Sequence, residues 1–255
     1  MRHPHRPIVV HVLTRAVLGG PTRPVLSLLE RLSARGFRTV LITGIPERYE
    51  AEAREMLAGY PDLPVLRLPC LVRRPSPLHD ARALAALLGA IRRLGPVIVH
   101  THTAKAGALG RVATRLVGGR QARAIHTFHG HSLDPAVAGH RASLWRLAER
   151  MLARRSSDLI IALSPGQRRE LCGLLGRQAA DRMHVVPLGY DFARRSGLPG
   201  TAPAVASSRP HGGRLLAFIG RGVPVKGLDV LAAAHARLQH RDPSQAQRLR
   251  VVVAG

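Results

Sequence analysis

Hydrophobic and polar positions change most sharply along residues 97–131. An apolar run of β-formers opens into a polar tip, His100 to Thr103, and a helix of small residues is predicted at 104–116. A second apolar run, 122–125, opens into a second polar tip at 126–131. Ligands of open parallel α/β sheets bind outside the carboxyl ends of the strands. We therefore expect both polar tips to face one crevice.

The same patterns predict an alternation of strands and helices along the rest of the chain. Apolar runs predict further strands at 8–13, 39–43, 65–68, 158–163, 183–186, 214–219 and 249–253. Helical spacing predicts helices at 22–34, 47–58, 78–94, 140–155, 164–176 and 228–239. This alternation favours an α/β fold, a Rossmann-like parallel sheet flanked by helices. In helix 140–155, the spacing predicts an inward face made of Leu144, Leu147, Met151 and Leu152.

A change in composition divides the chain. Gly, Pro, Ser and Ala dominate 191–213, which we interpret as a linker. The predicted organisation is a Rossmann-like domain at 1–190, the linker, and the start of a second Rossmann-like domain at 214–255. One strand–turn–helix–strand unit cannot close a sheet or bury both of its faces, so we expect the second domain to be incomplete.

The chain is strongly basic, with 39 Lys and Arg against 15 Asp and Glu and a formal net charge of +24. An arginine-rich composition without function explains this as well as an anionic partner does. Because the charge is spread over every predicted helix and only 3% of residues are aromatic, we favour an anionic membrane surface over nucleic acid. Lys105 and Lys226 are the only lysines, and both lie at strand-to-helix turns.

Cysteine content and hydropathy bear on location. Cys70 and Cys172 have no CxxC neighbour, which disfavours a disulfide framework or a zinc site and favours a reducing compartment. No apolar run approaches the roughly 18 residues that span a bilayer, and the first one is too short for a signal peptide. We expect a cytoplasmic protein, either free or peripheral on the inner face of the cytoplasmic membrane.

Two glycine-containing turns are candidate phosphate sites. In GRGVPVKG, residues 220–227, the glycines allow close backbone approach, while Arg221 and Lys226 offer cations beside a helix N-terminus. It is not a Walker A loop, and a plain turn is the alternative. Gly19 and Gly20 follow the first strand, where an ordinary turn is again the alternative. The GxGxxG fingerprint is absent, so dinucleotide binding is disfavoured.

Histidines crowd both polar tips, and the set is His100, His102, His126, His129 and His131. Zinc binds imidazole, but no carboxylate or cysteine accompanies these histidines, so we favour hydrogen bonding to a polar ligand and expect no metal. His129 is the best candidate for a ligand contact, whereas His126 could simply cap its strand. Ser164 followed by Pro165 predicts a helix N-cap rather than a hydrolase elbow, because GxSxG is missing.

Six segments together resemble the family 4 retaining glycosyltransferases of GT-B fold, in the same order along the chain. They are the Gly19–Gly20 loop, HTHTAKAG (100–107), HTFHGH (126–131), DLIIALSPGQRREL (158–171), HVVPLGYD (184–191) and GRGVPVKGLDVL (220–231). The resemblance implies transfer of a sugar from a nucleotide-diphosphate donor, most simply a UDP-sugar, without a metal cofactor. A cell-envelope or exopolysaccharide acceptor, lipid-linked or free, is expected.

The resemblance also implies roles for single residues. Arg221 and Lys226 would hold the donor diphosphate, approached by Gly19 and Gly20, and His129 would contact the sugar near the reacting carbon. The acceptor side would be lined by His102, Thr103, Lys105 and His131. The family's Glu-x7-Glu element has no match, so we expect a truncated enzyme with little activity of its own. The alternative is a binding module that lacks the donor-domain glutamates.

Overall fold

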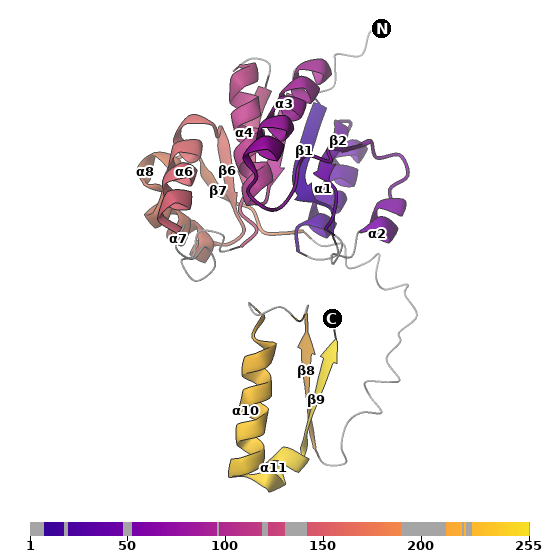
Figure 1. The fold of residues 1–255 in the computed structure, drawn as a ribbon, viewed down its shortest axis with the longest axis vertical. Helices are drawn as coiled ribbons and strands as arrows, with labels where there is room; N and C mark the ends of the chain where they lie inside the picture. Colours follow the sequence, from indigo (N-terminus) through magenta and orange to yellow (C-terminus); the bar gives the residue numbers. More distant parts are fainter. Residues whose placement is uncertain are drawn as a thin grey trace. The chain divides into compact units, whose positions relative to one another are not determined.

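The structure, a computed structural model, describes residues 8–17, 20–47, 53–95, 97–118, 122–130, 142–189, 213–220, 222 and 226–254. The chain divides into two compact units, Met1–Asp191 and Phe192–Gly255, and each is considered by itself (Figure 1). The predicted linker lies, apart from Gly213, outside the described residues.

Unit 1 is built on a seven-stranded sheet in the order β3-β2-β1-β4-β5-β6-β7, and every neighbouring pair is parallel. The predicted α/β fold is thereby confirmed. Its strands are β1 (Ile8–Arg15), β2 (Arg38–Gly44), β3 (Val65–Arg67), β4 (Val97–His102), β5 (Ala122–Thr127), β6 (Leu159–Ala162) and β7 (Met183–Val185).

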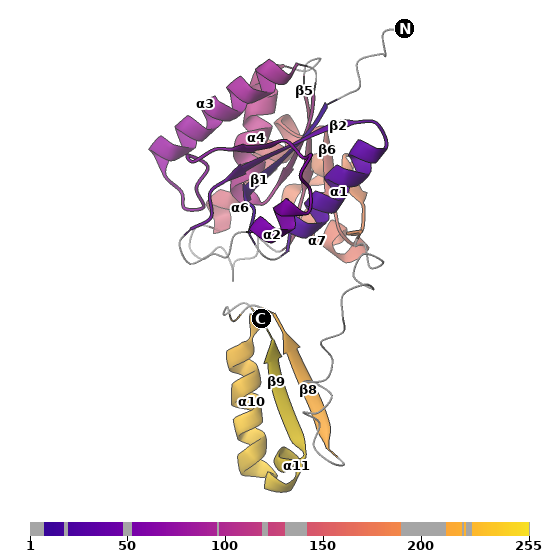
Figure 2. The same ribbon diagram turned by 90° about the vertical axis from the view of Figure 1, so that its right-hand side faces the viewer.

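Helices pack on both faces of this sheet. They are α1 (Thr22–Ala34), α2 (Arg54–Ala58), α3 (Pro77–Leu94), α4 (Ala104–Val117), α6 (Ala142–Arg155), α7 (Pro165–Leu175) and α8 (Arg177–Ala180). Helices α3 and α4 cover one face, and α1 covers the other (Figure 2). Successive strand residues point to opposite faces. In β1, therefore, Val10 and Val12 join the core under α3 and α4, whereas Leu13 packs with Leu26 of α1.

Helix α6 does not bury the face that its spacing predicts. Leu144, Leu147 and Met151 are 69%, 55% and 49% exposed, so their predicted inward orientation is wrong. The helix instead turns Glu149 inward, where both carboxylate oxygens accept hydrogen bonds from the fully buried Arg111 of α4 at 2.9 and 2.7 Å. A buried guanidinium needs a paired carboxylate, and this requirement sets the rotation of the helix.

Unit 2 contains β8 (Arg214–Ile219), α10 (Leu228–Arg241), α11 (Pro243–Gln247) and β9 (Leu249–Ala254). The two strands pair in parallel. Ala246 is the one buried hydrophobic residue in the described part of this unit. Across both units, the helices that the structure describes are too short or too polar to cross a membrane.

Candidate functional site

A cavity of about 240 Å³ lies at the carboxyl ends of the unit 1 strands. The chain leaves β1 toward β2 on one side of the sheet, and β4 pairs with β1 on the other side. This reversal of strand order is the switch point at which open α/β sheets bind ligands. The polar lining of this cavity consists of Ser27, Arg31, His100, His102, Thr127 and His129, and none of its described lining residues is acidic.

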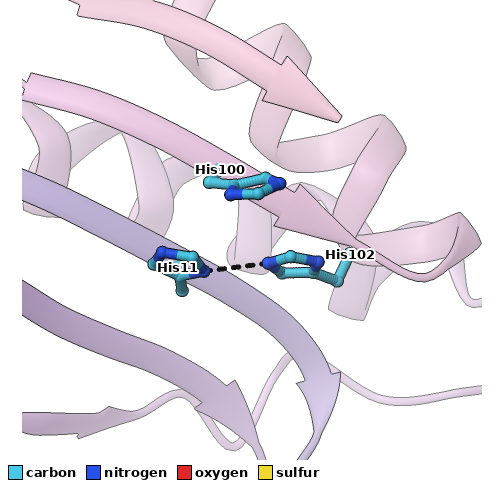
Figure 3. Close-up of side chains that lie close together, drawn as sticks. All are labelled: His11, His100 and His102. Atoms are coloured by element: carbon cyan, nitrogen blue, oxygen red, sulfur yellow. Dashed lines mark hydrogen bonds between the residues drawn. The ribbon is translucent and has the colours of Figure 1, made fainter. Parts of the chain in front are cut away.

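Three imidazoles form a chain of hydrogen bonds beside this cavity. His11 Nδ1 lies 2.9 Å from His102 Nε2, and His102 Nδ1 lies 2.8 Å from His129 Nε2. The side chains of His11, His100 and His102 pack together across β1 and β4 (Figure 3). His100 Nε2 lies 2.7 Å from Thr127 Oγ1. The fold thus brings the two predicted polar tips together through His102 and His129.

Burial keeps these imidazoles uncharged. It lowers the pKa of His11 to about 3 and that of His129 to about 4. Burial, with repulsion from neighbouring histidines, holds the pKa values of His100 and His102 well below the usual range. A neutral imidazole carries one donor and one acceptor nitrogen. At neutral pH these histidines are therefore directional hydrogen-bonding groups without charge, and the cation of the cavity lining is Arg31.

His126 does not face this cavity, contrary to the expectation that all the tip histidines share one crevice. It lies on the opposite face of the sheet, where its Nδ1 is 2.9 Å from Thr101 Oγ1 and its ring packs edge-on against Phe128. Neighbouring positions in a strand alternate between faces, so His126 cannot share the orientation of Thr127. His131 lies outside the described residues.

Thr103 adopts a rare backbone conformation at the end of β4. Its φ of 66° and ψ of 159° make it the one non-glycine residue with positive φ in the described part of the chain. This region is populated almost only by glycine, and such strain is concentrated at functional sites. Its Oγ1 lies 2.7 Å from Thr14 Oγ1, which ties the end of β4 to the end of β1.

Lys105 is engaged within the domain. Its Nζ pairs with Asp80 Oδ1 of α3 at 2.5 Å and donates to the carbonyl of Arg74. This ammonium joins α4 to α3 and the loop before it, and its side chain is only 10% exposed. Gly20 is exposed, and Gly19 lies outside the described residues.

In unit 2, the predicted phosphate turn joins β8 to α10. Gly227 caps α10 in the left-handed region, at a φ of 69° that favours glycine, and Lys226 beside it is exposed. The first backbone N–H groups of a helix attract anions. Lys226 therefore stands where a phosphate could bind, while Arg221 lies outside the described residues.

His11, His100 and His102 also form a candidate metal cluster, since their ligand atoms all lie within 4.8 Å of one another. The donor set suits hydrogen bonding better. Among the described residues no carboxylate belongs to the cluster, so a divalent ion would bring uncompensated charge into a buried site. Both nitrogens of His102 already have hydrogen-bond partners, and a metal would have to break one of these bonds.

Sequence reasoning missed His11 and the pair of Arg111 with Glu149. His11 is hidden inside a strand that is otherwise rich in valine, and its one signal is a polar residue at a buried register position. The partner of Arg111 lies 38 residues away and depends on how α6 packs on α4, which no local pattern specifies.

A Rossmann-like parallel sheet with a polar cavity at its switch point, followed by a second parallel β-unit, is the architecture of the GT-B glycosyltransferases. The sequence matches the model of Glycosyltransferase Family 4 over residues 18–194. The chain belongs to this family, which confirms the resemblance seen in its motifs.

Two relatives of this chain carry the names of glycosyltransferases. It is 27% identical over 263 residues to the D-inositol 3-phosphate glycosyltransferase of Thermomonospora curvata, an alignment that covers 93% of this chain and 58% of the relative. It is 27% identical over 197 residues to the Escherichia coli UDP-Gal:alpha-D-GlcNAc-diphosphoundecaprenol alpha-1,3-galactosyltransferase, covering 76% of this chain and 48% of the relative. The chain thus spans roughly half of each relative.

The fold is also similar to that of HepE from Anabaena, solved with UDP and glucose. The TM-score is 0.63 at 18% sequence identity, and the match covers 96% of this chain and 60% of HepE. At this identity the likeness concerns the fold alone.

Proposed function

We propose that this chain provides the acceptor-side domain and the first part of the donor-side domain of a retaining glycosyltransferase. The donor is a UDP-sugar, and the acceptor is a cell-envelope or exopolysaccharide precursor. The observation that carries this proposal is the neutral histidine cavity at the switch point of a Family 4 chain. HepE was solved with UDP and glucose, which supports the choice of nucleotide.

The residues suggest how transfer would proceed. The acceptor hydroxyl forms a new bond to the anomeric carbon on the face from which the diphosphate departs, and its proton passes to the departing phosphate oxygen. This route requires no acidic nucleophile, and the described lining of the cavity offers no carboxylate. Lys226 and Arg221 would stabilise the charge on the diphosphate, which favours a reaction without a metal.

Titration of the full chain with UDP-glucose, with and without Mg²⁺, tests donor binding. We expect binding in both conditions and a roughly tenfold weaker affinity in Lys226→Ala, which removes a phosphate contact worth about 1.4 kcal/mol. Arg237→Ala, an exposed cation farther along α10, is the matched control and should bind like the parent chain. Absence of binding, or equal weakening in both variants, would count against the donor site.

Sugar transfer is tested by comparing this chain with a version extended through a complete donor domain, each supplied with lipid-diphosphate and free-saccharide acceptors. Transfer by the extended version alone supports the proposal that this chain is part of the enzyme. The binding-module alternative instead predicts UDP-sugar affinity and no transfer in either version. Transfer to the lipid-diphosphate acceptor would match the chemistry named for the Escherichia coli relative.

We further propose that the enzyme works at the inner face of the cytoplasmic membrane. The exposed apolar residues of α6 support this location, because they share their side of the helix with exposed arginines. Apolar side chains that enter the headgroup region, combined with cations, bind anionic membranes. The groups concerned are Leu144, Leu147, Met151, Arg154 and Arg155.

Flotation with liposomes tests this location. We expect the chain to float with vesicles that contain phosphatidylglycerol and not with neutral vesicles. The double variant Leu144→Ser/Leu147→Ser should lose most of this binding, whereas Leu78→Ser, at a 60% exposed leucine of α3, should retain it. Membrane docking through α6 is contradicted if flotation does not depend on lipid charge, or if the double variant floats as well as the parent chain.

A further inference from the structure

The histidine chain beside the cavity has two free ends. It runs from His11 on β1, through His102 at the end of β4, to His129 just beyond β5. His11 Nε2 and His129 Nδ1 are both buried and lack a hydrogen-bond partner among the described residues. The two ends differ in their surroundings. His11 is completely enclosed, whereas the His129 side chain lines the cavity.

Only two directions are open to a chain of neutral imidazoles. Each ring has one N–H and one bare nitrogen, so a donor at one end requires an acceptor at the other. In one direction, the enclosed His11 Nε2 carries an N–H without a partner. In the other direction it is a bare lone pair. Buried N–H groups without partners are rare in proteins, because no hydrogen bond offsets the free-energy cost of removing them from water.

Either direction leaves one N–H without a partner among the described residues. Only His129 lines the cavity, where a ligand oxygen can accept that N–H, and this difference sets the direction. His11 Nδ1–H donates to His102 Nε2, His102 Nδ1–H donates to His129 Nε2, and the remaining N–H is on Nδ1 of His129. We propose that His11 and His102 are positioning residues that fix His129 in this tautomer, so that its Nδ1–H can donate to an oxygen of the ligand. The ligand identity, a nucleotide sugar with its hydroxyl and phosphate oxygens, rests on the proposed function.

This arrangement gives a reason for a buried histidine, His11, in the otherwise apolar middle of β1. A lone His129 would populate both tautomers and would offer a ligand either a donor or a lone pair. Coupling to two enclosed rings leaves one form, so the donor is organised before the ligand arrives. Preorganised donors of this kind lower the free-energy cost of binding an oxygen whose charge increases during a reaction.

Nitrogen NMR of the histidine rings in the intact chain tests the proposal directly. Protonated and bare ring nitrogens resonate in separate regions, so each tautomer can be read once the signals are assigned from single substitutions. We expect His11, His102 and His129 all to be protonated at Nδ1 at pH 7.5. Finding His129 protonated at Nε2 would overturn the proposal, and this measurement needs no variant to remain folded.

A pair of substitutions at His102 tests whether the tautomer is imposed. In His102→Asn, the amide nitrogen can replace Nδ1 as donor to His129, so the Nδ1–H form should persist. In His102→Leu, the donor is lost, and the His129 signals should shift toward the second tautomer. An unchanged tautomer in a folded His102→Leu chain would show that His102 does not position His129.

Addition of UDP-glucose separates this inference from the proposed function. With the expected tautomer in the free chain, a change in the His129 Nδ1 signal on titration supports donation to the ligand. The expected tautomer without any change on titration leaves the positioning role in place and counts against UDP-sugar as the ligand. A changed signal with the opposite tautomer overturns the inference alone.

Discussion

Gly107 of α4 lies directly against the imidazole of His126. A Cβ at this glycine would be 2.5 Å from His126 Cε1, closer than side-chain atoms approach one another. Because His126 is fully buried and bonded to Thr101, its ring cannot easily move aside. The glycine thus sets how closely α4 packs on β5.

We therefore expect Gly107→Ala to destabilise the domain by about 1–3 kcal/mol, the usual cost of overpacking a core. Gly173 in α7 is the matched control, because a Cβ there meets nothing within 4 Å. Gly173→Ala should instead stabilise the chain by about 0.5–1 kcal/mol through helix propensity. Urea denaturation of both variants measures these effects, and a neutral or stabilising Gly107→Ala would show that the contact is not tight.

A second prediction concerns Arg111 and Glu149. Removing one partner leaves the other as a buried charge without its counter-ion. Arg111→Met alone, which leaves Glu149 unpaired, should therefore cost about 3–5 kcal/mol of unfolding free energy. Replacing both, in Arg111→Met/Glu149→Leu, should cost less than either single change. Urea denaturation of the double-mutant cycle measures this coupling, and additive losses would contradict a mutually dependent pair.

A third prediction uses the strain at Thr103. A variant with glycine is ordinarily less stable than one with alanine at the same position, because glycine loses more backbone entropy on folding. At a φ of 66° that order should reverse, because this conformation costs a side chain about 1–3 kcal/mol. We expect Thr103→Gly to unfold at a higher urea concentration than Thr103→Ala. Both variants lose the hydroxyl contact to Thr14, so the comparison isolates the backbone.

Stability should depend on pH through the buried histidines. The folded-state pKa of His11 is about 3, below the unfolded value of 6.5, so only the unfolded chain takes up this proton between these values. Stability is therefore full above pH 6.5 and is lost as the pH falls. At pH 5 the loss from a group with this shift is about 2 kcal/mol.

Denaturation between pH 7.5 and pH 5 checks this dependence. His11→Asn should reduce the slope of unfolding free energy against pH by close to one proton. Equal slopes in the parent chain and in His11→Asn would mean that His11 is not held neutral.

The sequence was sufficient to predict the parallel sheet and most of its elements, because buried strands are continuous apolar runs and helices carry clear end signals. Ser164, for example, caps α7 as predicted, accepting from the backbone N–H of Gln167. Hydrophobic spacing identified an apolar stripe on α6 but not which side of the helix meets the domain. That choice depends on the distant Arg111.

The site was partly predictable for a similar reason. The polar tips at the strand ends indicated the cavity, since topology requires the ends of parallel strands to meet. Their orientation needed the strand register. His100 and His102 share one face, whereas His126 belongs to the face covered by α4. The contribution of β1 to the histidine chain follows from pairing between β1 and β4, which no local pattern shows.

The histidine chain also imposes an order on folding. Its first bond joins residues 91 positions apart, across two strands that are neighbours only in the finished sheet. During synthesis, β1 can pair with β2 long before β4 has left the ribosome, so one edge of β1 stays unpaired until then. Such non-local pairing is slow. The cavity is thus assembled late, and a chain that stalls before β4 leaves one edge of the apolar β1 open to aggregation.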